Sequence, residues 1–238
     1  MLSKKVLKDI QSLALKKQRE ETGLFVAEGP KIVEELMQIV PEQIEAIYAT
    51  QAWDARRTPE KIIDISEAEL EKMSLLKTPN QVLAVIKQFE SVRPANAGFL
   101  LYLDTIQDPG NFGTIIRIAD WFGIKHIVCS AGCADRYNPK VVQSTMASIA
   151  RVNVFYDIAD NWLAQQKTTV YAASLHGSPL DSFSKTGDGI LIIGNESKGI
   201  RKEYLDLANE LITIPRRGEA ESLNAAVATG IVLSHLLK

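Results

Sequence analysis

The chain has 238 residues, a formal net charge of −2 and a hydrophobic content of 46%. This length is enough for one large domain or two modest ones with ample core, and the composition is that of an ordinary globular protein. The small negative charge excludes a protein that binds nucleic acid by bulk charge alone, so such binding would have to come from local clusters of basic residues.

Targeting and metal signals are absent from the sequence. No apolar run approaches 18 residues, and the first six residues lack the apolar core of a secretory signal, so we expect a cytoplasmic protein with no membrane span. The two cysteines, Cys129 and Cys133, are too few and too close for a disulfide framework. They could supply half a metal site, but a buried strand end at Cys129 and an incidental reduced thiol at Cys133 explain them more simply, so we expect no metal.

The first 90 residues show the pattern of a small αβ domain. In chain order we expect a helix at 3–20, strands at 25–27 and 44–48 with a helix at 31–38 between them, a strand at 62–63, a helix at 66–75 and a strand at 82–86. Ser66 followed by Glu69 is a capping box that opens the helix at 66–75. Residues 91–98 lack periodicity and contain a proline and a glycine, so we place a linker there between a domain at 1–90 and a domain at 99–238.

From residue 99 onward, short apolar runs alternate with helical stretches. We expect strands at 99–103, 126–130, 152–155, 169–174, 190–194 and 211–214, and helices at 112–122, 139–146, 158–166, 200–207 and 222–236. Such alternation predicts an α/β fold with a mostly parallel sheet and helices on both faces.

Three of these strands end in polar loops. In an open α/β sheet the ligand lies beyond the carboxyl ends of the strands, so the three loops should converge on one crevice. The loops supply Asn111, Arg117, Glu196, Ser222 and Asn224.

The same loops carry a family resemblance. Asn-x-Gly-x-x-x-Arg at 111–117, Gly-Asn-Glu-x-x-Gly at 194–199, and Ile-Pro followed by Ser-Leu-Asn at 214–224 resemble the three ordered motifs of the SpoU/TrmH family. These proteins are RNA ribose 2′-O-methyltransferases of the SPOUT superfamily. Each motif alone is weak, but their order, each after a predicted strand, makes the signal specific.

The resemblance implies more than the residues show by themselves. It implies S-adenosylmethionine as the methyl donor, RNA as the substrate, a C-terminal trefoil knot from about Ile190 onward, and a homodimer formed through the catalytic domain. Lys17 and Arg19, followed by the stretch 23–31, resemble a substrate-binding domain of the L30e type that is often fused ahead of the catalytic domain. By analogy, this fusion favours rRNA of the 23S type over tRNA. A turn and a helix start explain Glu28, Gly29 and Pro30 equally well.

The reaction places clear demands on the catalytic residues. A ribose 2′-hydroxyl is a poor nucleophile, and its developing negative charge needs a nearby cation or proton acceptor. The family assigns activation of the hydroxyl to the arginine that matches Arg117. Because a guanidinium is almost never deprotonated, we expect Arg117 to stabilise the developing alkoxide and anchor the adjacent phosphate; the alternative is a surface arginine.

The other motif residues have structural alternatives. Asn111 could cap its helix, although the resemblance implies that it shapes the active site beside Arg117. Glu196 is expected to orient Arg117 or Asn224, or else to satisfy a helix N-terminus. Ser222 could cap the last helix, whereas the resemblance implies catalytic positioning for both Ser222 and Asn224.

By the same resemblance, a set of backbone and small side-chain groups forms the donor pocket. Glycines in this set permit close approach. The set comprises Gly194, Ile214, Leu223, Ser174, Leu175, Asn195, Gly199 and Pro215.

Basic residues gather near this region and at the start of the chain. One cluster lies within residues 4–19, and the other comprises Lys198, Arg201, Lys202, Arg216 and Arg217. Both fit solvated surfaces, but the second adjoins the predicted crevice, which favours phosphate binding there. Arg216 and Arg217 stand where the family often has methionine, which leaves the local RNA contacts open.

Two other functions compete with the methyltransferase. A dinucleotide-binding protein requires Gly-x-Gly-x-x-Gly after the first strand, and the stretch 108–113 has the wrong spacing. A catalytically inactive protein that only binds RNA and dimerises would fit the loss of Arg117, Glu196 or Asn224, yet all three are present.

Overall fold

The computed structural model of the protein describes residues 2–54, 62–95 and 98–237. The chain forms two compact units, an N-terminal unit of Met1–Glu90 with Asp135–Ala150 and a C-terminal unit of Ser91–Ala134 with Arg151–Lys238. The segment 135–150 was expected in the second domain, but it packs with the first unit. Within the linker expected at 91–98, residues 96 and 97 lie outside the described part of the chain.

The N-terminal unit is built around a four-stranded sheet in the order β1-β4-β2-β3. Strand β4 is antiparallel to both β1 and β2, and β3 is parallel to β2. Its elements are α1 (Lys4–Ser12), α2 (Lys16–Thr22), β1 (Leu24–Glu28), α3 (Pro30–Ile39), η1 (Pro41–Gln43), β2 (Ile44–Ala49), β3 (Ile62–Asp64), α4 (Glu67–Met73), β4 (Val82–Lys87), α6 (Pro139–Thr145) and η3 (Ser148–Ala150).

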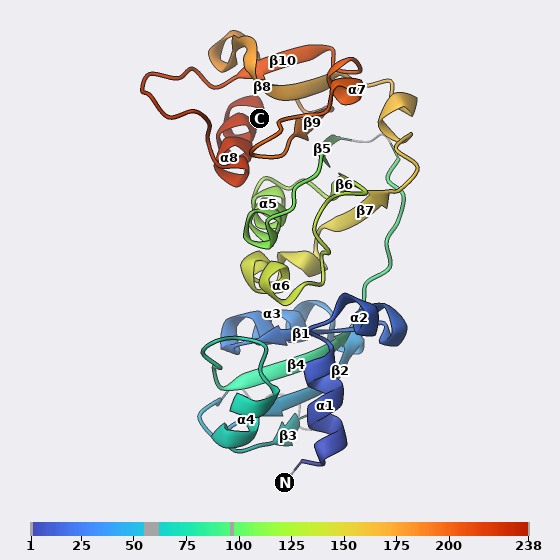
Figure 1. The fold of residues 1–238 in the computed structure, drawn as a ribbon, viewed down its shortest axis with the longest axis vertical. Coiled ribbons are helices and arrows are strands. Elements are labelled where there is room, and N and C mark those ends of the chain that lie inside the picture. Colours follow the sequence, from blue (N-terminus) through green and yellow to red (C-terminus); the bar gives the residue numbers. More distant parts are fainter. Residues whose placement is uncertain (1, 55–61, 96–97, 238) are drawn as a thin grey trace. The chain divides into compact units, whose positions relative to one another are not determined.

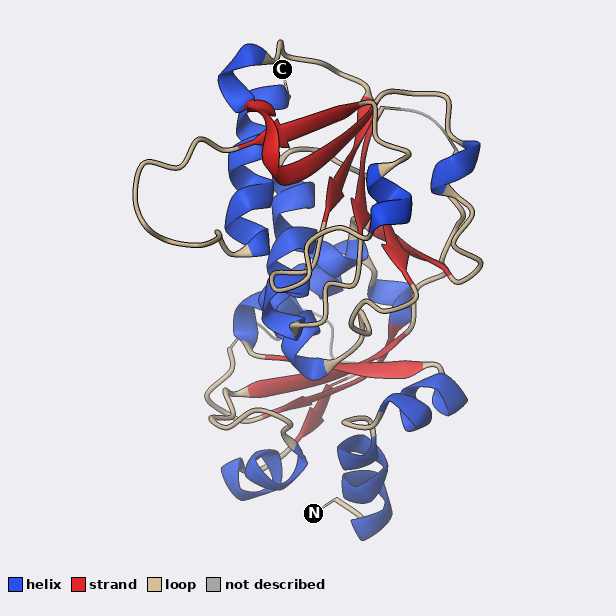
Figure 2. Cartoon of the chain, turned by 45° about the horizontal axis from the view of Figure 1, so that its top comes forward, coloured by secondary structure: helices blue, strands red, loops and turns tan. Residues whose placement is uncertain are grey.

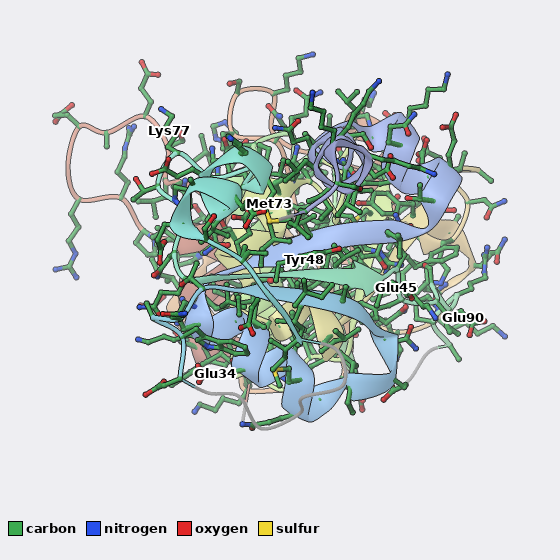
Figure 3. The ribbon with its side chains drawn as sticks, turned by 90° about the horizontal axis from the view of Figure 1, so that it is seen from below. Glu34, Glu45, Tyr48, Met73, Lys77 and Glu90 are labelled. Carbon is green, nitrogen blue, oxygen red and sulfur yellow. The ribbon has the colours of Figure 1, made fainter. Side chains whose placement is uncertain are left out.

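Alternating side chains of this sheet pack on two layers of helices. Phe25 and Ala84 belong to a core cluster with residues of α3 and α6, whereas Tyr48 belongs to a second cluster with residues of α1 and α4. Figure 3 shows Tyr48 and Met73, which both lie in this second cluster. The segment 135–150 therefore completes one face of the sheet, which explains why it packs with residues far from it in sequence.

The first helix differs from its prediction because of Arg19. The expected helix at 3–20 is broken between α1 and α2, where the Nη1 atom of Arg19 donates to the carbonyl oxygens of Leu13 (2.7 Å) and Ala14 (2.8 Å). Arg19 is only 2% exposed and forms an ion pair with Asp135. It is therefore a core residue, although it was expected in a basic surface cluster.

The predicted capping box is confirmed. Ser66 Oγ accepts from the backbone N–H of Glu69, and Glu69 Oε2 accepts from the backbone N–H of Ser66. The backbone N–H groups of Ser66 and Leu2 hold the pKa of Glu69 at about 2.

The C-terminal unit contains a six-stranded sheet in the order β10-β8-β9-β5-β6-β7, and every described pair in it is parallel, as predicted (Figures 1 and 2). Its elements are β5 (Phe99–Leu103), α5 (Pro109–Trp121), β6 (His126–Ser130), β7 (Asn153–Asp157), η4 (Leu163–Gln165), β8 (Val170–Pro179), η5 (Leu180–Ser182), β9 (Gly189–Ile193), α7 (Lys202–Leu205), β10 (Glu210–Thr213) and α8 (Ala225–Leu236).

Helices cover the two faces of this sheet. Leu100 and Tyr102 of β5 pack with Trp162, which precedes η4, and with Tyr204 of α7. Helices α5 and α8 pack on each other. The helix expected at 158–166 is reduced to η4, because the Asp157 carboxylate accepts from the backbone N–H of Trp162 at 2.8 Å and holds a loop there.

The strand order creates one switch point. From β5 the chain proceeds outward through β6 and β7, then returns on the other side of β5 through β8, β9 and β10, with β9 next to β5. The crevice beyond the carboxyl ends of β5 and β9 is where ligands bind in such sheets. No helix among the described residues is long and apolar enough to span a membrane.

Strand β8 has a marked irregularity beside this point. Leu211 pairs with Ala172, but the next residue, Ile212, pairs with Ser178, so 173–177 loops out of the ladder. Gly177 lets the chain return, because a Cβ there would lie 2.3 Å from the carbonyl oxygen of Leu211. The looped-out residues are thereby placed at the carboxyl end of β9.

Candidate active site

The first loop follows β5 and leads into α5. Asp108 caps this helix by accepting from the backbone N–H of Asn111 at 2.8 Å, with Pro109 in the first turn. The alternative in which Asn111 is the cap is therefore wrong. Since the cap is provided by Asp108, the Asn111 side chain is available for contacts outside its own helix.

The second loop follows β9 and is folded around Asn195. The Oδ1 atom of Asn195 accepts from the backbone N–H groups of Ser197 and Lys198, both at 3.0 Å, and its Nδ2 atom donates to the carbonyl oxygen of Thr105 at 2.9 Å. Its main chain exchanges two hydrogen bonds with Gly199, which has φ +70°. Asn195 thus shapes the loop and fastens it to the loop after β5.

Gly194 is required for this tight loop. A Cβ at Gly194 would lie 2.5 Å from both the carbonyl carbon of Gly199 and the backbone nitrogen of Ile200. Those are main-chain atoms, so they cannot move aside without opening the loop.

Asn111, Glu196 and Asn224 form a continuous hydrogen-bonded chain. Asn111 Nδ2 donates to Glu196 Oε1 at 2.5 Å, and Asn224 Nδ2 donates to Asn111 Oδ1 at 2.8 Å. A carboxylate only accepts, so Glu196 fixes which way the Asn111 amide points, and that orientation presents Oδ1 to Asn224. Residues of all three predicted loops therefore meet. Glu196 reaches Asn224 only through Asn111 and bonds neither Asn224 nor Arg117 directly, which corrects the expected pairing.

The third loop ends at Asn224. Its Oδ1 atom accepts from the backbone N–H groups of Ala226 (3.0 Å) and Val227 (3.2 Å), so Asn224 is the N-cap of α8. The alternative in which Ser222 caps this helix is therefore wrong. One amide thus starts the last helix with its oxygen and contacts Asn111 with its nitrogen.

We expect Asn224→Ala to lower the free energy of unfolding by about 1 kcal/mol, because the cap is removed. This corresponds to a melting temperature lower by roughly 2–4 °C, measurable by thermal unfolding. Asn224→Ser is the matched control, since serine caps helices well but is too short to replace the bond to Asn111. The serine variant should regain most of the stability; a serine variant as unstable as the alanine variant would contradict capping by the Asn224 side chain.

Arg117 lies about two turns along α5 from Asn111. Its side chain is exposed, and within the described parts of the chain it makes no hydrogen bond or ion pair. A guanidinium presents five N–H donors in a planar fork that suits an oxyanion or a phosphate. Those donors are not engaged by the described residues.

A pocket of about 630 Å³ lies at the carboxyl ends of β8, β9 and β10. All eight residues predicted for the donor pocket line it, together with Glu196 and Ser222. Asn111, Arg117 and Asn224 are not among its lining residues. The volume falls in the usual range for small-molecule sites.

Sequence reasoning missed part of the pocket wall. The excursion at 173–177 places His176 in the wall, and the inner face of α8 adds Ala228 and Val232. The register jump that forms the excursion has no sequence signal beyond Gly177. Leu175 and Leu223 are 66% and 45% exposed, so two apolar side chains remain open to a ligand.

The basic cluster beside the pocket divides into two kinds of residue. Arg201 is engaged in ion pairs with Asp104, Asp160 and Glu203, so its predicted phosphate-binding role is replaced by a structural one. Arg216 donates only to the carbonyl oxygen of its neighbour Ala220, at 3.3 Å, among the contacts of the described residues. Lys198, Arg216 and Arg217 line the pocket.

Cys129 and Cys133 are not joined by a disulfide bond. Cys129 is buried at its strand end, as expected, but Cys133 is not incidental: its thiol donates to the carbonyl oxygen of Leu103 at 3.2 Å and accepts from the backbone N–H of Ile106 at 3.3 Å. The pKa of Cys133 is lowered from its usual value, and the hydrogen bond with Cys129 is the largest cause. In the part of the chain that the structure describes, no group of three or more His, Cys, Asp or Glu residues could hold a metal ion.

The chain is thus an α/β protein with a parallel sheet and a pocket of small-molecule size at the carboxyl ends of three of its strands. Two family models match the chain. Residues 98–234 match the SpoU rRNA Methylase family, and residues 4–84 match the MRM3-like substrate binding domain. The chain belongs to the SpoU rRNA methylase family.

Relatives extend over both units. The 23S rRNA (guanosine(2553)-2′-O)-methyltransferase RlmP of Bacillus subtilis is 32% identical over 236 residues, which cover 97% of this chain and 95% of that protein. A structure from Porphyromonas gingivalis assigned to the TrmH family of RNA methyltransferases has a TM-score of 0.88 at 35% identity and covers 98% of this chain and 97% of that one. An rRNA methyltransferase from Sinorhizobium meliloti with bound AdoMet has a TM-score of 0.83 at 29% identity, covering 98% and 94%.

The predicted enzyme class and cofactor are confirmed by this membership. Proteins of the family are S-adenosylmethionine-dependent RNA ribose 2′-O-methyltransferases, and this chain is an enzyme of that class. The inactive RNA-binding alternative and the dinucleotide-binding alternative are therefore set aside.

Proposed function

We propose that the chain methylates the ribose 2′-hydroxyl of one nucleotide in rRNA of the 23S type. The observation that carries the catalytic assignment is the hydrogen-bonded chain Glu196–Asn111–Asn224, in which Glu196 lines the 630 Å³ pocket and Asn111 lies in the first turn of the helix that carries Arg117. The relatives RlmP and RlmB, from Bacillus subtilis and Coxiella burnetii, are named for 23S rRNA, which favours rRNA over tRNA.

The pocket fits the methyl donor by volume and by the chemistry of its lining. The open side chains of Leu175 and Leu223 offer an apolar surface for a flat ring, and the main chain around Gly194 and Gly199 offers polar groups at close approach. Ser174, Asn195, Ile214 and Pro215 complete the set of residues that would hold the donor. When bound, S-adenosylmethionine supplies an electrophilic methyl group.

Arg117 acts on the other reactant. It stabilises the negative charge that develops on the ribose O2′ and binds the adjacent phosphate, since its donors face no described protein partner. Glu196 and Asn224 hold the Asn111 amide in one orientation at the start of the same helix. Ser222 lines the pocket in the loop before α8 and is assigned to positioning.

The N-terminal unit binds the RNA outside the reacting nucleotide. Its four-stranded sheet with helices on both faces supports the L30e-like assignment. Lys4, Lys5 and Lys8 are exposed on α1, whereas Lys16 and Lys17 of α2 lie 3.5 Å and 3.8 Å from glutamate carboxylates. The lysines of α1 are therefore the better candidates for phosphate contacts.

The C-terminal unit forms a homodimer and contains a trefoil knot. Exposed apolar side chains support the dimer: Trp121 of α5 is 85% exposed, and Val227 and Ile231 of α8 are 50% and 37% exposed, on two helices that pack together. The knot is supported by the strand order, in which β9 lies between β8 and β5, and by Thr186, which pairs with Leu237 after α8. With an rRNA substrate, the enzyme acts in the cytoplasm.

The proposal is tested with labelled S-adenosylmethionine and RNA from a bacterium that lacks the corresponding methyltransferase gene. We expect 2′-O-methylated nucleosides in rRNA after digestion, with free RNA or with ribosomal particles. Label confined to tRNA would overturn the rRNA assignment. Donor binding without label in any RNA or particle would overturn the proposed substrate.

The charge of the loop after β10 leads to a separate prediction. This loop extends away from the sheet toward α8 (Figure 1) and carries Arg216 and Arg217. We expect the double variant Arg216→Gln/Arg217→Gln to raise KM for RNA several-fold and to reduce the slope of log affinity against log salt by about 1 for each phosphate that is no longer neutralised, with kcat nearly unchanged. Titration of RNA binding at several salt concentrations measures this.

Lys185→Gln provides the control for that double variant. It removes one positive charge from an exposed position of the same unit that does not line the pocket. An equal effect per charge in both variants would show that net charge, rather than the loop, determines RNA affinity.

A further inference from the structure

Asp104 is a fully buried carboxylate placed directly after β5. Its Oδ2 atom accepts from the backbone N–H of Arg201 at 2.8 Å, and its Oδ1 atom accepts from Arg201 Nε at 2.9 Å. The hydroxyl groups of Thr105 (2.8 Å) and Ser130 (3.3 Å) donate to the same oxygen, Oδ1. A buried carboxylate is tolerated only when it is paired and hydrogen-bonded in this way.

Arg201 belongs to the loop that follows β9, and it is held from several sides. Its Nη1 atom lies 3.3 Å from Asp160 Oδ2, and its Nη2 atom donates to the hydroxyl of Tyr204 at 2.5 Å. The guanidinium also lies over the Tyr204 ring, 4.5 Å from the ring centroid. The orientation of this side chain is therefore fixed by the protein.

Two neighbouring residues after β5 thus fasten the pocket loop at both of its ends. The carbonyl oxygen of Thr105 accepts from Asn195 at the start of the loop, and the carboxylate of Asp104 binds Arg201 at its end. Thr105 has φ +59°, a region that non-glycine residues seldom adopt, and its backbone N–H donates to Ser130 Oγ at 2.9 Å. Glu196 lies between the two points of attachment.

The same segment after β5 continues to Asn111, the partner of Glu196. The position of Glu196 relative to Asn111 therefore depends on how the pocket loop is attached to Asp104 and Thr105. We propose that Arg201 and Asp104 are positioning residues for methyl transfer: their ion pair sets the loop 194–200, and with it the donor pocket and Glu196, against Asn111. This inference rests on the proposed function.

A purely structural salt bridge is the alternative, and the chain offers a matched control. Arg151 Nε lies 2.7 Å from Asp120 Oδ2, and the two side chains are 31% and 17% exposed. Neither residue lines the pocket. Arg151→Met therefore removes a comparable ion pair from the same unit without touching the pocket loop.

The test compares Arg201→Met, Arg201→Lys and Arg151→Met for melting temperature, S-adenosylmethionine Kd, kcat, and KM for RNA. We expect Arg201→Met to lower kcat by about 10- to 100-fold, because small misplacements of reacting groups have effects of this size. It should also weaken donor binding several-fold while leaving KM for RNA unchanged. Arg201→Lys keeps the charge but not the planar fork, so its kcat should be partly restored. Arg151→Met should lose less thermal stability, because Asp120 is partly exposed, and should leave kcat and Kd unchanged.

A double variant tests whether Arg201 affects kcat through Glu196. If Arg201 acts through Glu196, then adding Arg201→Met to Glu196→Gln should lower kcat by less than about 2-fold, because residues that act together are not additive. Full additivity would overturn the inference. So would equal effects of Arg201→Met and Arg151→Met on kcat and donor Kd, or a rise in KM for RNA alone, which would instead mean that Arg201 binds RNA.

Other outcomes separate this inference from the function on which it rests. Should Arg201→Met fail to fold, Arg201→Lys and Asp104→Asn carry the same comparison. Should the parent protein bind the donor but methylate no RNA, the proposed substrate fails, whereas the inference is still judged by whether Arg201→Met weakens donor binding and Arg151→Met does not.

Discussion

Replacing Arg117 with alanine is expected to lower kcat by about two to three orders of magnitude, the usual effect of removing one donor that stabilises a developing oxyanion. Donor binding should not change, because Arg117 does not line the pocket. Thermal stability should change little, because the side chain is exposed and has no hydrogen bond or ion pair within the described residues. A lower kcat with unchanged donor binding and unchanged thermal stability is expected for a residue that acts on the transition state.

Single-turnover methylation of rRNA with saturating donor measures this effect directly. Arg117→Lys is the informative companion, since an ammonium supplies charge without the planar fork and should recover only part of the rate. An alanine variant with parent-like kcat and a raised KM for RNA would show that Arg117 binds substrate only. Loss of donor binding in that variant would contradict the position of Arg117 outside the lining of the pocket.

Gly194→Ala should have the largest effect on the pocket. The added Cβ would lie 2.5 Å from main-chain atoms of Gly199 and Ile200, so the loop must open to admit it. We expect the free energy of unfolding to fall by about 1–3 kcal/mol, the range for overpacking a tight site. Donor Kd should rise at least about 10-fold, since the displaced loop lines the pocket on one side.

Calorimetric titration with S-adenosylmethionine, together with denaturant unfolding, measures both effects. Gly187→Ala is the control, because a Cβ at Gly187 meets nothing within 4 Å. The control should bind the donor like the parent protein. Parent-like donor binding by Gly194→Ala would mean that the loop adapts and that its close approach to Gly194 is not needed for the pocket.

Sequence patterns predicted the C-terminal sheet well because its signals are local. Each apolar run of the expected length became a parallel strand, and the residues after three of these strands met as the open-sheet rule requires. The eight residues expected around the donor line one pocket. A motif directly after a predicted strand can be placed from the sequence, because the end of the strand fixes where the motif lies.

Features that depend on distant partners could not be predicted. The break after α1 is stabilised by Arg19, whose ion pair with Asp135 joins residues far apart in sequence. The segment 135–150 has an ordinary helical pattern, and only the three-dimensional core shows that it packs with the first unit. Arg201 lies among basic residues that are typical of a surface. Nothing in the sequence marks Asp104 as the buried partner of Arg201.

The helix caps show a similar limit at short range. Asp108 and Asn111, like Ser222 and Asn224, are all residue types that cap helices, so composition leaves the choice open. The structure resolves it through geometry: Asp108 and Asn224 accept from helix N–H groups, while the Asn111 side chain bonds to Glu196 and Asn224.

The position of β9 between β5 and β8 has a consequence for biosynthesis. The pocket is lined by residues from 173 to 232, so its walls are among the last parts of the unit to leave the ribosome. Parallel pairing between strands far apart in sequence is slow, because loop closure precedes the contacts that stabilise it. Strand β5 must therefore wait, with one edge unpaired, until β9 has been made. On the proposed assignment of this pocket to the methyl donor, a nascent chain acquires its affinity for the donor only after α8 is synthesised, so donor binding reports the final stage of folding.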